Sequence, residues 1–159
     1  MSMKRYVNYY EELGIGYKAS YREIKDAYLG KVLEFNDKVN SENIDLSDYE
    51  KICDISRGFF YFSDMEKRFM YDINVKEANV SASDNNVDLY GDLYVLDNDY
   101  SLGEDKKLFD VLMSINRGFF NKISSTNNKD LLKVYSLISV NCKIIKGQLE
   151  EKEINSKKR

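Results

Sequence analysis

The chain has 159 residues with a formal net charge of −3, and 43% of its residues are hydrophobic. This length and composition can bury the core of an ordinary domain, and the mildly acidic balance gives no general attraction to nucleic acid or to a membrane, so neither is expected as a partner. The sequence contains no His and no Pro, which excludes imidazole chemistry and favours uninterrupted helices.

The predicted elements begin with a short helix over 7–13 and an amphipathic helix over about 21–35, in which apolar residues recur at steps of three and four. A third helix is predicted over about 48–62, and a short, mostly charged helix over about 64–71. The two longer helices, joined by a loop of about a dozen residues, predict an antiparallel hairpin. Together these elements form a predicted N-terminal domain over 5–72.

Local signals mark where the helices begin and end. Gly14 is suited to a left-handed cap at the end of the first helix. A Ser-x-x-Glu pair ahead of a helical pattern predicts an N-cap hydroxyl that accepts from a first-turn N–H and a glutamate that reaches back to the cap. The pairs are Ser20 with Glu23, Ser47 with Glu50, Ser63 with Glu66, and Ser101 with Glu104.

The C-terminal half begins with a polar, acidic linker region predicted over 73–103. An amphipathic helical hairpin is predicted over 104–153, followed by a charged tail over 154–159. The apolar stripe over 131–149 comes close to a heptad seam. Two arrangements fit this pattern: a hairpin that packs on itself or on the N-terminal domain, which we favour, and self-association or a partner interface through the C-terminal helices.

A short motif recurs between the two halves, as ISRGFF at 55–60 and INRGFF at 115–120. Duplication and chance are both compatible with a match of this length. A glycine inside a helix costs about 1 kcal/mol relative to alanine. Gly58 and Gly118 therefore predict close approach of a neighbouring helix, which for Gly118 is the other helix of the C-terminal hairpin. For Gly58 the family resemblance described below implies that the neighbour is the second helix.

Cys53 and Cys142 both fall in apolar helical patterns. Buried, reduced thiols are favoured over a redox pair, and two isolated cysteines do not make a zinc site. No nucleophile-base pair, phosphate loop or metal cluster is recognisable, so we expect no enzymatic activity, no metal and no cofactor. A secretory signal and a long apolar run are both lacking, so a cytoplasmic location is expected.

Three stretches resemble the J domain of DnaJ-type co-chaperones: YYEELGI at 9–15, ASYREIKDAY at 19–28 and ICDISRGFFYFSDMEKRFMYD at 52–72. The resemblance implies an all-α protein with a four-helix N-terminal domain, in which the second and third helices form an antiparallel hairpin. The family's Ser-Asp, Lys-Arg and Tyr-Asp positions are Ser63, Asp64, Lys67, Arg68, Tyr71 and Asp72. The core implied by the resemblance and the apolar stripes is Tyr10, Leu13, Ile24, Ala27, Tyr28, Ile52, Ile55, Phe59 and Phe62.

The chain departs from this family at the His-Pro-Asp tripeptide, which the family carries in the loop between its second and third helices. Aligned without a gap, those positions are Asn36, Asp37 and Lys38, and with a one-residue shift they are Phe35, Asn36 and Asp37. In the family this tripeptide triggers ATP hydrolysis by the DnaK-type chaperone partner. The resemblance therefore implies that the fold is kept and the trigger is lost.

The outer face of the second helix, which in the family is basic and docks on the chaperone, carries Arg22, Lys25 and Lys31. Acidic residues on the same helix reduce its local charge, so weak docking and a solvated face of mixed charge are both compatible with the sequence.

Two functions follow as hypotheses. The first is a non-enzymatic J-like adaptor or regulator that binds a DnaK-type chaperone or another J protein. The alternative is an interaction or scaffold protein that reuses a J fold with no chaperone role. A continuous basic patch on the second helix favours the first hypothesis, and a neutral or covered patch favours the alternative.

Overall fold

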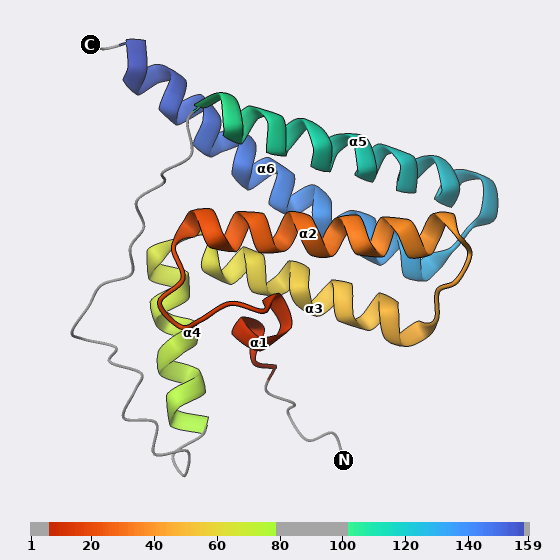
Figure 1. The fold of residues 1–159 in the computed structure, drawn as a ribbon, viewed down its shortest axis with the longest axis horizontal. Coiled ribbons are helices and arrows are strands. Elements are labelled where there is room, and N and C mark those ends of the chain that lie inside the picture. Colours follow the sequence, from red (N-terminus) through yellow and green to blue (C-terminus); the bar gives the residue numbers. More distant parts are fainter. Residues whose placement is uncertain (1–6, 79–101, 158–159) are drawn as a thin grey trace.

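The computed structural model describes residues 7–78 and 102–157, and in these ranges its only regular secondary structure is α-helix. The all-α fold class predicted from the sequence is therefore confirmed. The described residues form six helices, labelled in Figure 1. They are α1 (Tyr9–Leu13), α2 (Tyr21–Asn40), α3 (Leu46–Phe62), α4 (Met65–Ala78), α5 (Leu102–Thr126) and α6 (Lys129–Lys157).

The helices form two antiparallel pairs that lie against each other (Figure 1). In the first pair α2 runs beside α3, α1 packs against α3, and α4 leaves the end of α3 at a steep angle. In the second pair α5 and α6 run along the first, with α6 against α3 and α5 against α2. One set of buried side chains continues through both pairs, so the C-terminal hairpin packs on the N-terminal half.

The residues predicted as core lie at the contacts between these helices. Phe59 stacks on Tyr28 with ring centroids 4.6 Å apart, and Phe62 stacks on Tyr10 at 4.3 Å. Ala27 is half-buried and packs against the same core. Each fully buried large apolar side chain contributes about 1.5–3 kcal/mol, so this set makes a large contribution to stability. The buried members are Tyr10, Leu13, Ile24, Tyr28, Ile52, Ile55, Phe59 and Phe62.

Two of the predicted caps are confirmed. Ser20 and Glu23 form a complete capping box at the start of α2, in which the Ser20 hydroxyl accepts from the Glu23 backbone N–H at 3.1 Å. Gly14 ends α1 in the left-handed region with φ of 74°, a conformation that costs glycine little because it has no Cβ.

Two other predicted caps are wrong, and Ser101 lies outside the described residues. Asp45 rather than Ser47 caps α3, and its carboxylate accepts from the Asp48 backbone N–H at 3.1 Å. Asp64 rather than Ser63 accepts from the first turn of α4, at 2.9 Å. In both cases an aspartate within two residues of the serine supplies the acceptor, because Asp and Ser cap helices about equally well and the local sequence cannot decide between them.

The helix boundaries differ from the prediction in one respect that matters for function. The second helix extends to Asn40, so residues 35–38 lie in its last turns and the loop to α3 covers only 41–45. The prediction of a loop at 35–38 is wrong because a chain without proline has nothing there to interrupt the backbone hydrogen bonds.

The predicted linker and tail are partly helical. α4 continues to Ala78, inside the linker predicted over 73–103, and 79–101 lie outside the described residues. α6 continues to Lys157, inside the charged tail predicted over 154–159.

The two glycines of the repeated motif have different surroundings. A Cβ on Gly58 would lie 2.8 Å from the Cβ of Tyr9, which confirms close approach, although the neighbour is α1 and not α2. No atom lies within 4 Å of the corresponding position on Gly118, so the prediction for Gly118 is wrong. Gly118 is on the exposed side of α5, where no helix covers it.

Candidate functional site

The centre of the basic face predicted on the second helix is covered by the C-terminal hairpin. Lys25 is 1% exposed, and its ammonium group donates to Asp105 Oδ1 of α5 at 2.5 Å. Lys152 of α6 contacts the other oxygen of the same carboxylate. Asp105 is itself buried, so one carboxylate holds two cations between α2, α5 and α6. The interpretation of Lys25 as part of an outer docking face is therefore wrong.

The electrostatics of this cluster are those of a structural ion pair. Burial lowers the pKa of the Lys25 ammonium, and the hydrogen bond that Lys25 donates to Asp105 opposes that shift. The Lys25 ammonium also lies 4.6 Å from the ring centroid of Tyr21, a second contact that favours its charged form. The cluster thus pairs the central cation of the predicted basic face with an internal carboxylate.

The remaining two residues of the predicted face are also close to carboxylates. Arg22 pairs with Glu104, the residue before Asp105, at 3.2 Å, and both side chains are about half-exposed. Lys31 lies 4.0 Å from Glu34 on its own helix. Exposed pairs of this kind contribute about 0–1 kcal/mol each, so they change the surface charge more than the stability.

Neutral hydrogen bonds add to the ionic contacts between the two helical pairs. The Tyr21 hydroxyl donates to Gln148 Oε1 at 2.7 Å. Asn141 Nδ2, which is buried, donates to the Tyr28 hydroxyl at 3.0 Å and to the Ser56 carbonyl at 2.9 Å. Because buried polar groups are costly unless paired, these bonds fix how α6 lies against α2 and α3.

Of the four residues at the degenerate tripeptide, Phe35 and Lys38 make side-chain contacts with other helices. Phe35 is buried and makes edge-to-face contacts with Tyr49 and Phe119. The exposed Lys38 pairs with Asp48 of α3 at 2.7 Å. Of the other two, Asn36 is half-buried and Asp37 is exposed near the end of α2. The end of α2 is therefore held by the buried Phe35 ring and by one ion pair to α3.

The positions that resemble Lys-Arg and Tyr-Asp join α1 to α4. Arg68 is fully buried and donates to the Tyr10 hydroxyl at 3.1 Å and to the carbonyls of Tyr17 and Ala19 at 2.9 Å. The Tyr10 hydroxyl in turn donates to Asp72 Oδ1 at 2.7 Å. Burial raises the pKa of Asp72 to about 6. These residues stabilise the fold and do not form an exposed site.

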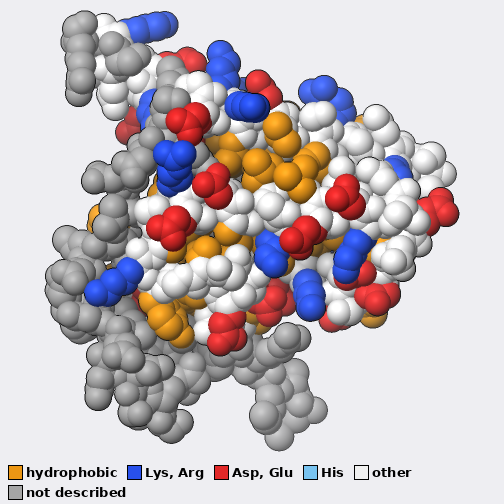
Figure 2. All heavy atoms as spheres, viewed as in Figure 1, with side chains coloured by type: hydrophobic (Ala, Val, Ile, Leu, Met, Phe, Trp, Pro, Cys, Tyr) orange, Lys and Arg blue, Asp and Glu red, His pale blue; other side chains and the backbone are white. Residues whose placement is uncertain are grey.

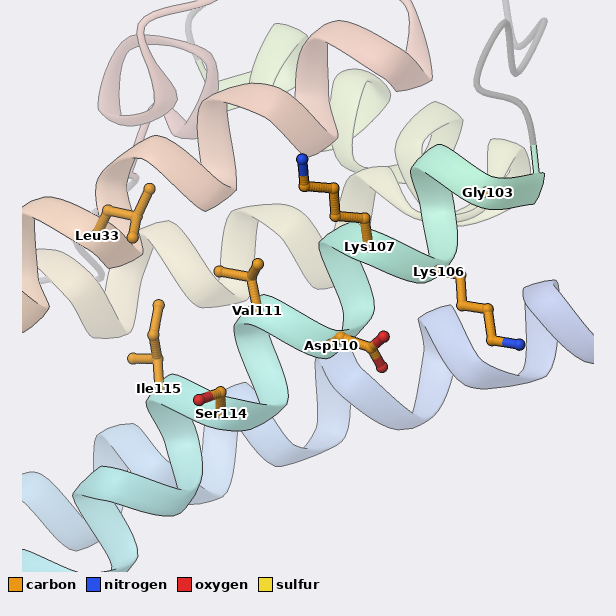
Figure 3. Close-up of a pocket in the computed structure, with 8 residues that line it drawn as sticks. All are labelled: Leu33, Gly103, Lys106, Lys107, Asp110, Val111, Ser114 and Ile115. Atoms are coloured by element: carbon orange, nitrogen blue, oxygen red, sulfur yellow. The ribbon is translucent and has the colours of Figure 1, made fainter.

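A groove between the two helical pairs is open to solvent beside the covered face. It has a volume of about 490 Å³ and lies between α2 and α5. In Figure 3, Leu33 of α2 lies opposite Val111 and Ile115 of α5, while Lys106 and Asp110 point away from α2. Figure 2 shows hydrophobic side chains gathered among charges of both signs on this face of the molecule.

A second, larger groove lies between α5 and α6. Its volume is about 680 Å³. It combines apolar side chains with the cations Arg117, Lys143 and Lys146. Sequence reasoning did not identify this groove or the Asp105 cluster, although the acidic start of α5 was a signal for contact with a basic face.

Within 7–78 and 102–157, no group of three or more acidic or cysteine side chains is placed to hold a metal ion. None of the helices in these ranges has the length and apolar character needed to cross a membrane. Cys53 and Cys142 are buried without forming a disulfide, as predicted, and burial raises the pKa of Cys142 to about 11.

No known protein family, curated protein or solved structure matches this chain. The class defined by the structure itself is an all-α protein of two packed helical pairs.

Proposed function

We propose that this protein acts by protein–protein binding, as a non-enzymatic interaction or scaffold protein built on a J-type helical frame. The antiparallel α2 and α3, with α1 against α3 and α4 beyond it, support the J-type assignment together with the sequence resemblance. The α5–α6 hairpin packs against α2 and α3 of this N-terminal half.

One observation carries the proposal: Lys25 is buried under Asp105. A helix face that docks on an acidic chaperone surface must offer exposed cations, since long-range steering and rim contacts depend on them. Here the central cation is internal and a second one, Arg22, faces Glu104. The covered face favours the scaffold hypothesis over the adaptor or regulator hypothesis.

The test is single-turnover ATP hydrolysis by the source organism's own DnaK-type chaperone, with this protein alone and with an authentic J protein present. The expected result is an unchanged rate in both arms. Stimulation by the protein alone overturns the proposal, because it means that the chaperone is triggered without His-Pro-Asp.

Suppression of the authentic J protein instead supports the regulator hypothesis. Lys31→Glu then identifies the surface involved, since Lys31 is the predicted face residue farthest along α2, and its ion pair with Glu34 is long, at 4.0 Å. Loss of suppression in this variant assigns the effect to α2.

A further inference from the structure

The larger of the two grooves described above, here named the α5/α6 groove, is an apolar surface left open by the fold. Phe120 is 49% exposed and Val140 is 45% exposed, and the Phe120 ring lies 5.5 Å from that of Tyr135. Both side chains therefore offer apolar surface to a binding partner at this groove. The groove is lined by Phe109, Met113, Asn116, Arg117, Phe120, Tyr135, Ser136, Ser139, Val140, Cys142, Lys143 and Lys146.

The charged side chains that line this groove are all positive. Arg117, Lys143 and Lys146 are exposed, and no Asp or Glu is among the lining residues. Among the described residues none of the three cations forms an ion pair. The α2/α5 groove differs because Asp110 accompanies its lysines. An acidic ligand is therefore complementary to the α5/α6 groove in a way that it is not to the other.

The shape of the groove suits a helix. Its lining residues recur at steps of three and four along both helices, from Phe109 to Phe120 on α5 and from Tyr135 to Lys146 on α6. Each run spans about three turns, or roughly 16 Å. The Asn116 amide donates to Ser139 Oγ at 2.9 Å across the floor, which holds the two walls together. A third helix that lies in this groove would pack against both α5 and α6, as in a helical bundle.

We propose that the α5/α6 groove docks an amphipathic α-helix of a partner protein, with apolar residues on the buried face and Asp or Glu on its flanks. This is the helix-in-groove mode, in which apolar anchors at helical spacing provide affinity and flanking charges provide orientation. The proposal rests on the proposed scaffold function and specifies the chemistry of the partner.

The probe is a fluorescein-labelled synthetic helix of about 18 residues, five turns, with Leu on one face and Glu on the flanks. A second probe carries Lys in place of every Glu. Binding to the full chain is measured by fluorescence anisotropy at low and at raised salt. The Glu probe is expected to bind at least about tenfold more tightly than the Lys probe, and to weaken as salt screens the cations.

Two matched pairs of variants locate the binding. Val140→Glu places a carboxylate in the groove. Leu132→Glu places one outside the groove, on the same helix and at a position of similar exposure, 46%. Lys143→Glu reverses a groove cation, and Lys133→Glu reverses an exposed cation elsewhere on α6. The groove variants are expected to weaken the Glu probe about tenfold or more, and the controls less than about twofold. Far-UV circular dichroism verifies that each variant folds.

Several outcomes overturn the proposal. Equal affinity for the Glu and Lys probes contradicts the argument from charge. Equal loss of affinity in Val140→Glu and Leu132→Glu shows that the probe does not bind in the groove. A concentration-dependent dimer abolished by Val140→Glu, seen by sedimentation, identifies a second copy as the occupant. Binding of a single-stranded RNA oligonucleotide that depends on Val140 identifies a nucleic acid. None of these readouts involves α2, so failure here is distinguishable from chaperone docking in the ATPase assay.

Discussion

Replacement of Asp105 by asparagine tests how the two helical pairs are held together. The Lys25 and Asp105 side chains are only 1% and 4% exposed, so the variant removes the negative charge that faces a buried ammonium group. Lys152 is 28% exposed and can turn toward solvent, whereas Lys25 cannot. Breaking a buried pair by removing one partner costs about 3–5 kcal/mol. That is a large part of the 5–15 kcal/mol or so that stabilises a typical domain.

The assay is urea unfolding at pH 7, followed by far-UV circular dichroism. Glu104→Gln is the matched control because Glu104 is also in the first turn of α5, so any loss of helix-dipole stabilisation is common to both variants. Its pair with Arg22 is about half-exposed, and its loss is expected to cost less than about 1 kcal/mol. If Asp105→Asn is no less stable than Glu104→Gln, the cluster does not hold the hairpin on α2.

The pH dependence provides an independent check. Burial lowers the pKa of Lys25 below its ordinary value of 10.5, so between the two values the unfolded chain binds more protons and stability rises with pH. Asp105→Asn is expected to lower the pKa of Lys25 in the folded chain further, because it removes the neighbouring negative charge. The loss of stability in this variant relative to the wild type is therefore expected to shrink as the pH rises toward 10.5. The double variant Lys25→Met with Asp105→Leu is expected to recover most of the loss, since apolar replacement of a buried pair is often neutral.

Three further predictions use the same unfolding assay. Gly58→Ala places a Cβ 2.8 Å from Tyr9 and is expected to lower the free energy of unfolding by about 1–3 kcal/mol. Gly118→Ala has open space around the new Cβ and is expected to raise the free energy of unfolding by up to about 1 kcal/mol. Equal effects of the two variants contradict the packing argument. Asp72 has its pKa raised from 3.8 to about 6, so the folded chain binds more protons in that window and wild-type stability falls as pH rises through it. Asp72→Asn is expected to lack this fall in the free energy of unfolding, which amounts to up to about 3 kcal/mol in the wild type. If the difference in stability between the two proteins does not vary with pH, the prediction is wrong. Asp37→Pro is expected to cost about 3 kcal/mol relative to Asp37→Ala because α2 continues through position 37; a smaller difference means that the helix ends earlier in solution.

Much of the candidate site could not be read from the chain because its contacts are distant in sequence. Lys25 is in a charged stretch and the helical pattern predicts an outer position, but its carboxylate partner is 80 residues away. The groove between α5 and α6 is a comparable case. Its cations and aromatics are on two helices, and only the packing of one against the other brings Phe120 beside Tyr135.

Local periodicity and capping chemistry determined most of the N-terminal half from sequence alone. The spacing of Ile24 and Tyr28 predicts a buried stripe, the Ser20 box predicts the start of α2, and these follow from interactions within a few residues. Tertiary structure alone decided which cations face solvent, as Lys25 shows. This depends on a free-energy balance set by neighbours far along the chain, because a buried ammonium is stable only where a carboxylate meets it.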